Sequence, residues 1–419
     1  MADKIKLITL SDHPLIPSGV AIQTRYILEG LLKTGDYTIH SLGAAQHHEE
    51  KRPVRVDEYG DDWVIWPTIG YGDMPTLRAA FDAHNYDALW FMTDPRFYTW
   101  LFEGMDEIKE RGAAVLYNHV WDEMPIPIYN KPFYVTCDYI GCISKLTHEI
   151  IKGVGLGDRS EYIPHAVDAN IFKPLGLRAG ERKALRSKIV GAQNADKFIL
   201  FFNSRNARRK MTGDILFAFK AFIEKIGRGK ALLFMHTDPN DSEGPNLHSI
   251  CNLLDLNAND VLFSTQPQQP QTMAQFYNIS DCLINISNNE GFGLSCLEAL
   301  SCGKLAVVNM TGGLQDQIKD PDSGIFYGVG IEPAAKNIAG SQQIPFIYDC
   351  RVAEKDVVDA LHKVYSMSPE KRDELGKKAR EHTLRNFSMD NMVTKWDKAI
   401  KHYVGLNRSA GTEVKVSNL

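Results

Sequence analysis

The stretch that decides the fold reads Asp281-Cys-Leu-Ile-Asn-Ile-Ser-Asn-Asn-Glu290-Gly-Phe-Gly-Leu-Ser-Cys-Leu-Glu298-Ala-Leu300. Its apolar first half predicts a buried strand that ends at Ser287, and a helix is expected to begin near Leu294. Between them, Gly291 and Gly293 let the backbone approach a ligand without an intervening side chain. Because the free amides of a helix N-terminus attract anions, this strand, turn and helix predict an anion site.

Two carboxylates flank this turn. Glu290 lies within the turn and Glu298 about one turn into the helix, so both can point into one pocket. One of them would suit sugar hydroxyls and the other a ribose diol. Taken alone, the pair fits an ordinary helix start with a solvated Glu298 better than a ligand site, and a second feature has to decide.

That second feature is the basic loop after the apolar run 198–203, where Arg205, Arg208, Arg209 and Lys210 fall within six positions. Arg205 and Lys210 flank a turn, and a guanidinium and an ammonium there could neutralise a diphosphate. By itself such a loop could also hold nucleic acid or be solvated surface. Together with the glycine turn and the two carboxylates, it describes a nucleotide-diphosphate site.

The rest of the chain alternates short apolar runs with helical stretches, which predicts an α/β fold of doubly wound parallel sheets. A hydrophilic segment, 172–197, is interpreted as a linker with a short helix that separates two such series. Ligands of these sheets bind at the carboxyl ends of the strands, so the cleft between the two series is the default site. The expected elements are strand 4–10, helix 19–33, strands 64–69, 87–92, 114–120, 139–143, 198–203, 231–236, 261–264, 282–286 and 305–308, and an amphipathic helix in 388–404.

Composition bounds the class of protein. The chain has 419 residues, of which 44% are hydrophobic and 24% charged, and these averages argue against disorder, collagen repeats and a disulfide scaffold. Its seven cysteines form an odd set without a C-x-x-C pair, so we expect mostly core cysteines, no zinc site and a reducing compartment. No run of 18 apolar residues and no signal-peptide core occur. We therefore expect a soluble, cytoplasmic protein.

The net charge of -5 is unevenly distributed: residues 1–170 sum to -10, residues 171–230 to +11 and residues 231–419 to -6. The basic island in the middle is assigned mostly to the phosphates of the expected nucleotide-diphosphate ligand and to solvation of the linker, with peripheral membrane contact as an open alternative. The acidic first part argues mildly against a long duplex lying on it, since non-specific affinity for DNA comes from neutralised phosphates.

These residues resemble the retaining glycosyltransferases of the GT-B fold, specifically the large family 4 group. The chain differs from the family pattern in having Ala166 after His165, Leu305 where proline is common, and a single glycine, Gly19, in the first loop. None of these differences removes a charged group. Five segments match the family in order, namely Pro17-Ser18-Gly19, Tyr162 to Phe172, Ser204 to Lys210, Glu290 to Gly303 with its E-x7-E signature, and Thr311-Gly312-Gly313-Leu314.

The resemblance implies a role for each matching residue. Arg205 and Lys210 would bind the donor diphosphate, Glu290 the sugar hydroxyls and Glu298 the ribose. His119, at the end of a strand, matches the histidine expected near the reacting sugar, although such a histidine is often structural. The implied catalytic residues are His119, Glu290, Arg205 and Lys210; the implied donor-binding residues are Gly19, Ser204, Gly291, Phe292, Gly293, Leu294, Glu298, Gly312 and Gly313; and the acceptor side is assigned to Trp121 and Asp122.

The family also implies the domains and the chemistry. Residues 1–170 would form an acceptor-side Rossmann-like domain onto which a helix in 388–419 returns, and residues 171–387 would bind the nucleotide-sugar. Transfer would retain configuration by a front-face reaction without a divalent metal, and Asp320-Pro-Asp322, the one obvious D-x-D, is interpreted as structural. Most of the six tryptophans are expected in the core.

The expected reaction moves a hexose from a UDP- or GDP-sugar to a carbohydrate or lipid-linked acceptor. No cofactor is expected, because the nucleotide-sugar is a co-substrate. Two alternatives remain open at this point. One is transfer to a modified base in DNA, and the other is a nucleotide-sugar binder or epimerase on the same fold.

Overall fold

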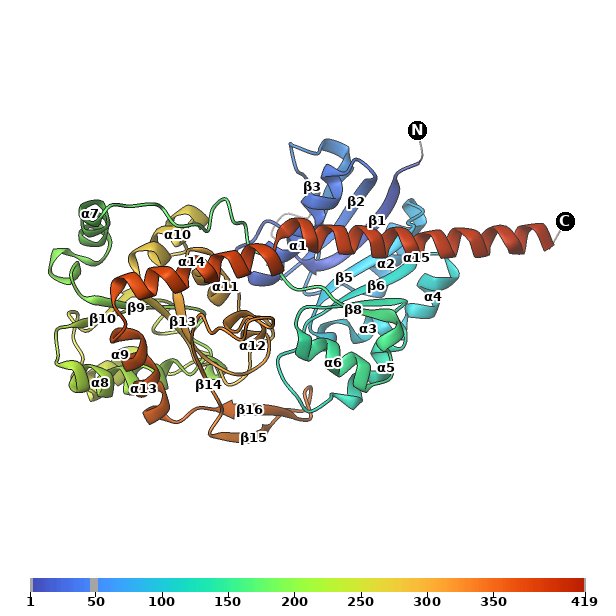
Figure 1. Ribbon diagram of the computed structural model, residues 1–419. Coiled ribbons are helices and arrows are strands. Elements are labelled where there is room, and N and C mark those ends of the chain that lie inside the picture. The colour runs from blue at the N-terminus through green and yellow to red at the C-terminus, as the bar shows by residue number, and fades with distance from the viewer. Residues whose placement is uncertain (1–2, 46–51, 418–419) are drawn as a thin grey trace. The chain divides into compact units, whose positions relative to one another are not determined.

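The computed structural model describes residues 3–45 and 52–417, and for residues 410–417 only the backbone. Its contacts divide the chain into two units (Figure 1). Unit 1 comprises Met1–Ala166, Gly340–Phe346 and Met389–Leu419, and unit 2 comprises Val167–Ala339 and Ile347–Ser388. The sequence placed the domain boundary at residue 170 and did not anticipate the short excursion at 340–346.

Unit 1 is built on an eight-stranded sheet of order β3-β4-β2-β1-β5-β6-β7-β8. All neighbouring strands are parallel except β3 and β4. The strands are β1 Ile5–Asp12, β2 Tyr37–Ala44, β3 Val54–Arg55, β4 Trp63–Pro67, β5 Ala88–Thr93, β6 Ala114–His119, β7 Tyr139–Cys142 and β8 Ser160–Tyr162. The helices are α1 Gly19–Lys33, α2 Met74–Ala83, α3 Thr99–Glu103, α4 Met105–Glu110, α5 Lys131–Tyr134, α6 Lys145–Gly153 and α15 Met389–Ser417.

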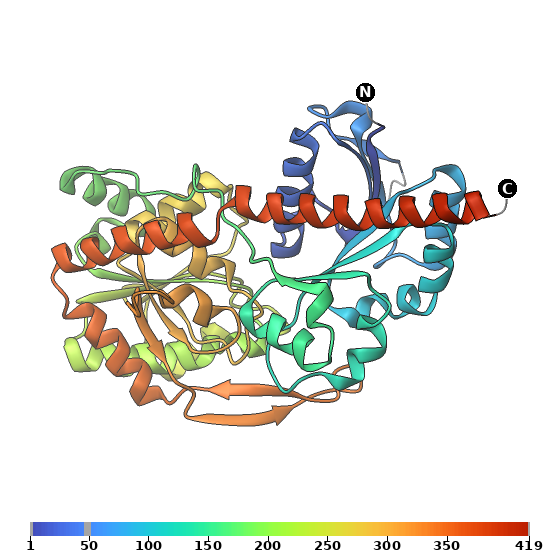
Figure 2. The same cartoon turned by 45° about the vertical axis from the view of Figure 1, so that its right-hand side comes forward.

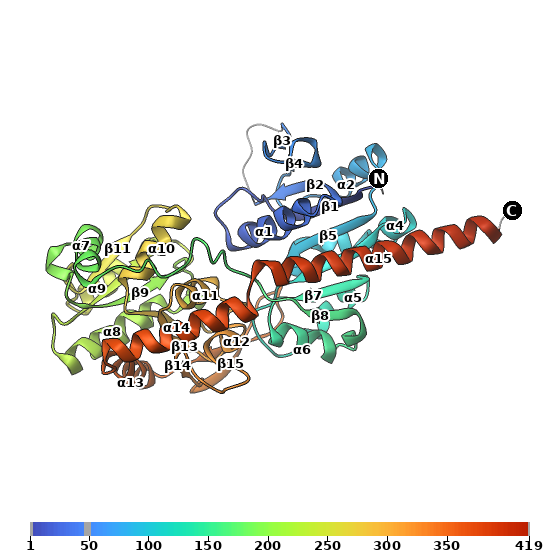
Figure 3. The same cartoon turned by 45° about the horizontal axis from the view of Figure 1, so that its top comes forward.

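Helices cover both faces of this sheet because the strands are apolar on both sides. On one face α1 and α15 pack together, and Trp396 of α15 contacts the ring of Trp90 edge-on. Figure 3 shows α15 running along this unit. The other face is covered by α2 to α6, whose apolar side chains form a second core with Phe91 and Tyr117. Chain segments more than 250 residues apart therefore share one core, as the returning helix predicts.

Unit 2 has a six-stranded parallel sheet of order β11-β10-β9-β12-β13-β14 and a separate antiparallel hairpin, β15-β16 (Figure 2). Its strands are β9 Phe198–Asn203, β10 Ala231–His236, β11 Val261–Ser264, β12 Cys282–Asn285, β13 Leu305–Asn309, β14 Gly328–Ile331, β15 Ala335–Ala339 and β16 Ile347–Arg351. Its helices are α7 Ala179–Val190, α8 Thr212–Ile226, α9 Leu247–Leu253, α10 Pro270–Ile279, α11 Leu294–Ser301, α12 Leu314–Ile318, α13 Glu354–Tyr365 and α14 Pro369–Asn386.

The predicted α/β class and doubly wound sheets are confirmed, as is the returning C-terminal helix. The sequence missed β2, β3, β8, β14 and the β15-β16 hairpin. Polar residues interrupt β2, as at His40 and Ser41, and the hairpin is largely exposed, so neither shows the apolar run on which the prediction relied.

The burial of the cysteines and tryptophans can be compared with what the sequence predicts. All seven cysteines are buried and unbridged, as core cysteines should be. Trp63 and Trp90 are fully buried, whereas Trp66 is 42% exposed. Within residues 3–45 and 52–417, the structure has no helix that is both long and apolar enough to span a bilayer.

Candidate functional site

The candidate site of unit 2 lies at the carboxyl edge of its sheet, where β9, β12 and β13 end. Gly293, with φ of +92°, precedes α11 and sits so close to α12 that a Cβ there would meet Leu314 at 2.5 Å. A Cβ on Gly313 would meet the Phe292 backbone at 2.6 Å, and the Gly313 amide donates to the Glu290 carbonyl at 3.0 Å. The glycines at these two positions thus let two loops touch through their backbones. Gly291, Phe292 and Gly312 complete this contact region, and Leu294 begins α11 as predicted.

Glu290 and Lys210 form a buried ion pair. Each residue is 8% exposed, and the Lys210 ammonium donates to Oε2 of Glu290. Ser287 Oγ and Asn285 Nδ2 donate weakly to the same oxygen at 3.4 and 3.5 Å, and Arg209 lies 3.8 Å from Oε1. Burial alone would raise the pKa of Glu290, but Lys210 and Arg209 outweigh it and lower the pKa to about 2. The carboxylate is therefore charged at any physiological pH.

Arg205 has a different partner and a different environment. It follows the partly buried Ser204 after β9 and makes a bidentate pair with Asp241, with Nε to Oδ2 at 2.6 Å and Nη2 to Oδ1 at 3.0 Å. Its side chain is 64% exposed. Arg205 and Lys210, which the sequence placed on the two sides of one turn, are thus each held by a separate carboxylate.

Glu298 is held from α10. Tyr277 donates to Oε2 of Glu298 at 2.5 Å and accepts from Asn203 Nδ2 at 2.8 Å, which ties the end of β9 to α11. Burial raises the pKa of Glu298 to about 7, and the Tyr277 hydrogen bond only partly opposes this. Glu290 and Glu298 therefore contact different partners, and burial is compensated by a cation only at Glu290.

The turn between β12 and α11 is braced by residues that the sequence did not single out. The Asn288 amide donates to the Arg209 carbonyl at 2.8 Å, and Arg209 Nη1 donates to the Asn289 carbonyl at 3.0 Å. Asp349 of β16 accepts from the side chains of Asn288 and Asn289 at 3.3 and 3.2 Å. Asp241, Tyr277 and Asp349 carried no local motif, so nothing in the sequence could have marked them.

The remaining predicted residues belong to unit 1. Gly19 is the first residue of α1, which Ser18 caps by accepting from the Ala21 amide at 3.0 Å. His119 ends β6, is fully buried and lies 2.9 Å from the Tyr134 hydroxyl through Nε2. Burial lowers the pKa of His119 to about 3, so its ring is neutral. Trp121 is 3% exposed, so its ring face is covered, and Asp122 is partly exposed.

Among the described residues, no group of three or more His, Cys, Asp or Glu side chains could hold a metal ion. Asp320 of the D-x-D stretch caps a turn, accepting from the amides of Asp322 and Ser323 and from Arg385. Asp320 therefore shapes this turn, as the structural interpretation of the stretch expects.

Comparison with known proteins agrees with this geometry. A family model described as glycosyl transferases group 1 matches residues 186–341. A D-inositol 3-phosphate glycosyltransferase of Saccharomonospora viridis is 29% identical over 231 residues, 54% of this chain and 47% of that protein. An alpha-monoglucosyldiacylglycerol synthase of Acholeplasma laidlawii is 24% identical over 186 residues, 44% of each chain. The chain thus spans about half the length of the curated relatives it matches.

Solved structures match almost the whole chain. A glycosyltransferase from Rickettsia africae has a TM-score of 0.71 at 15% identity, covering 96% of this chain and 99% of that one. An Anabaena protein, HepE, solved in complex with UDP and glucose has a TM-score of 0.68 at 14% identity, covering 95% and 100%. At these identities the likeness shows the fold. The chain therefore has the GT-B fold, and residues 186–341, nearly all of them in unit 2, are similar to the glycosyl transferases group 1 family.

Proposed function

We propose that this chain is a hexosyltransferase that moves a hexose from a nucleotide-diphosphate sugar to a carbohydrate or lipid-linked acceptor. The observation that carries the proposal is the buried Lys210–Glu290 pair at the carboxyl edge of a domain similar to group 1, with Arg205 on the same loop as Lys210. An ammonium has three protons, so Lys210 can hold Glu290 and still donate to phosphate oxygens.

The proposed roles follow from these contacts. Arg205 and Lys210 bind the diphosphate and stabilise the charge that develops on it as the sugar leaves. Glu290, ionised and fixed, accepts hydrogen bonds from sugar hydroxyls, while Glu298 contacts the ribose. His119 contributes Nδ1, a buried atom that has no hydrogen-bond partner among the described residues. Gly19, Trp121 and Asp122 remain proposed donor and acceptor contacts of unit 1.

The chemistry we propose is a front-face substitution with retention and without a metal. The bond between the anomeric carbon and the diphosphate oxygen breaks, the acceptor oxygen bonds to that carbon on the same face, and the acceptor's proton passes to the departing phosphate. No covalent bond to Glu290 is needed. Proton NMR of the fresh product tests the stereochemistry, and an inverted anomer would refute this mechanism.

A UDP-sugar is the favoured donor. The HepE structure contains UDP and glucose, and a related trehalose-6-phosphate structure from E. coli holds UDP-2-fluoro glucose. GDP remains the second candidate, and the reaction is placed in the cytoplasm. By their names, one relative above is a D-inositol 3-phosphate glycosyltransferase and the other makes alpha-monoglucosyldiacylglycerol, which is compatible with a sugar-like or a lipid-linked acceptor.

A thermal-shift panel of UDP-, GDP- and ADP-sugars tests the donor, and we expect a UDP-sugar to raise the melting temperature most. Hydrolysis of that donor without acceptor should then fall in Lys210→Ala and Glu290→Ala. Unchanged turnover in both variants would contradict the site. Transfer to hydroxymethylated DNA at low and moderate salt serves as the competing assay, and robust, salt-sensitive transfer would replace the acceptor proposed here.

A further inference from the structure

A second cationic hollow lies at the opposite, amino edge of the unit 2 sheet. Its deep part is a recess of about 20 Å³ lined by Arg182, Lys304, Arg372 and neighbouring residues. A larger hollow of about 570 Å³ shares four of these lining residues, Arg182, Asp281, Pro369 and Arg372. The recess has room for one small group, and the larger hollow has the size of a ligand pocket.

The charges around this hollow do not cancel. The recess and the larger hollow together are lined by six cationic side chains and three carboxylates. The cations are Arg182, Arg186, Lys197, Lys230, Lys304 and Arg372, and the carboxylates are Asp196, Asp281 and Asp373. Two of the carboxylates are already held by cations. Asp281 pairs with Arg186 at 2.7 Å and with Arg182 at 3.0 Å, and Asp196 pairs with Lys183 at 2.6 Å. An excess of positive charge is left facing the hollow.

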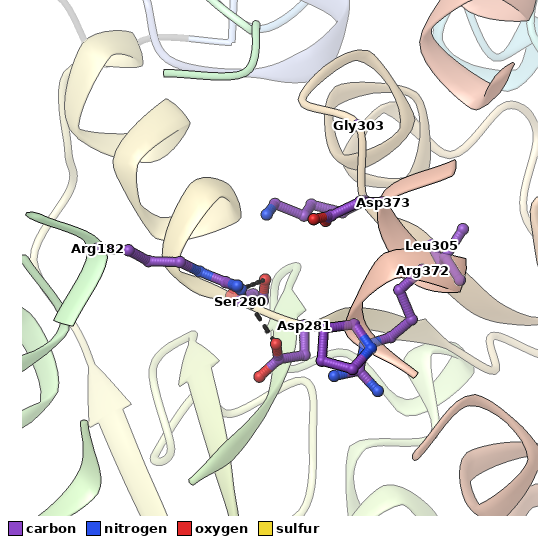
Figure 4. Close-up of a pocket in the computed structure, with 9 residues that line it drawn as sticks. Arg182, Ser280, Asp281, Gly303, Leu305, Arg372 and Asp373 are labelled. Carbon is purple, nitrogen blue, oxygen red and sulfur yellow. Dashed lines mark hydrogen bonds and ion pairs between the residues drawn. The ribbon is translucent and has the colours of Figure 1, made fainter. Parts of the chain in front are cut away.

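Arg182 has donor capacity to spare. Figure 4 shows its guanidinium beside Ser280 and Asp281, to which Nη2 donates at 3.1 and 3.0 Å. Its Nε is buried and has no hydrogen-bond partner among the described residues. A buried donor without an acceptor costs free energy, so an unpartnered N–H on a residue that lines a recess is consistent with a site that takes a ligand.

Lys304 is the second uncommitted cation. It lies between α11 and β13, and its ammonium makes no hydrogen bond or ion pair in the part of the chain that the structure describes. Burial, and then the nearby Arg182, lower the pKa of Lys304 to about 8. An anion bound between Lys304 and Arg182 would relieve this repulsion.

Arg372 closes the recess from a third element, α14. Its Nη1 donates to the Met367 carbonyl at 2.7 Å, and the guanidinium lies over the Phe198 ring, 5.6 Å from the centroid. These contacts fix the orientation of the guanidinium. Three cations therefore reach one recess from α7, from the turn before β13 and from α14, which suits a group that accepts hydrogen bonds on several sides.

We propose that this recess binds the phosphate group of a small phosphorylated molecule, at a site separate from the donor site on the other edge of the sheet. This also corrects the sequence interpretation, which treated the basic residues of the linker as solvated surface. Arg186 is only 8% exposed and holds Asp281 in the wall of the hollow, and Arg182 beside it faces the recess.

The test is calorimetric titration of the full chain with inorganic phosphate and with pyrophosphate. Lys304→Gln should weaken binding about tenfold or more, as the loss of a hydrogen bond to a charged group does. Lys304→Arg should keep it, and Lys336→Gln on the exposed strand β15 is the matched control and should leave it unchanged. Arg182→Gln gives a second variant in case Lys304→Gln unfolds.

Arg205→Gln separates the two edges of the sheet. If phosphate binds at the amino edge, the Arg205→Gln variant still binds phosphate in the titration, and this binding is lost when Lys304→Gln is added. If Lys304→Gln and Arg182→Gln both bind phosphate as the wild type does, the proposal is wrong, and loss of all binding in Arg205→Gln would assign the phosphate to the donor edge. The proposal would also be wrong if the protein bound phosphatidic acid vesicles through Lys304 but did not bind free phosphate.

Discussion

Two ion pairs at the carboxyl edge of unit 2 have the same chemistry and differ in the exposure of the cation. The side chains of Lys210 and Glu290 are 10% and 11% exposed, whereas in the other pair Asp241 is 13% exposed and Arg205 is 64% exposed. Breaking a buried pair leaves a charge without solvent, while an exposed arginine can exchange its carboxylate for another anion at little cost. The buried pair therefore holds the site's shape, and the exposed arginine is free to follow a ligand.

The largest effect should come from breaking the buried pair. Lys210→Met leaves Glu290 charged and without its cation, and we expect a loss of about 3–5 kcal/mol in the free energy of unfolding. Urea denaturation measures it. The double variant Lys210→Met/Glu290→Met should lose less, because no buried charge remains. A single variant that costs under about 1 kcal/mol would show that the pair is solvated and would remove the contrast with Arg205.

Acid should break the same pair. The pKa of Glu290 is lowered from 4.5 to about 2 in the folded chain, so its stabilising contribution is present above pH 4.5 and is lost as the pH falls towards 2. We expect this contribution to be about 3 kcal/mol. Comparing urea midpoints of wild type and Glu290→Gln at pH 6 and pH 3.5 measures it. If the gap between the two proteins does not shrink at the lower pH, the pKa shift is absent.

The same contrast explains what the sequence could predict. Helix α1 from Gly19 to Lys33 and the start of α11 at Leu294 were predicted correctly, because an N-cap serine and glycines mark them locally. The partners of the charged residues were not, because Asp241 lies 36 residues from Arg205 and Tyr277 lies 21 residues from Glu298. Such pairs form only when parallel strands bring their ends to one edge.

Burial was also beyond the sequence. His119 and Trp121 are residue types that are expected in an open sugar site, yet they are only 0% and 3% exposed. Tyr134 packs against His119, and Tyr129 packs against Trp121. At the amino edge, Arg182 and Lys304 line one recess although they are 122 residues apart in the sequence. A linear pattern identifies charged residue types, but only the fold decides which charges remain uncompensated.

Glu298 extends the comparison to a carboxylate without a cation. Its pKa rises from 4.5 to about 7, so the folded chain holds its proton more tightly and loses stability from this group as the pH rises from 4.5 to 7. Glu298→Gln should remove that loss and gain about 2 kcal/mol relative to wild type between pH 5 and pH 8. Glu332→Gln, at an exposed position, is the control for thermal denaturation at both pH values. A relative stability independent of pH in Glu298→Gln would contradict the shift.

The smallest effect on stability should come from the exposed pair. Arg205→Gln removes a bidentate contact of a 64% exposed arginine, and the Asp241 carboxylate keeps its hydrogen bond from the Glu243 amide. Unfolding should therefore change by less than about 1 kcal/mol, with Arg178→Gln, which breaks the exposed pair with Glu181, as the control. Its affinity for the nucleotide-sugar should nevertheless fall about tenfold or more, since a charge-assisted contact to the diphosphate is lost. Arg205→Lys should recover only part of this, because an ammonium cannot reproduce the planar fork.

Urea midpoints and donor titrations on the same preparations separate the two effects. If Arg205→Gln destabilises the chain as much as Lys210→Met while donor affinity is unchanged, the roles of the two pairs are reversed, and Arg205 shapes the site while Lys210 follows the ligand.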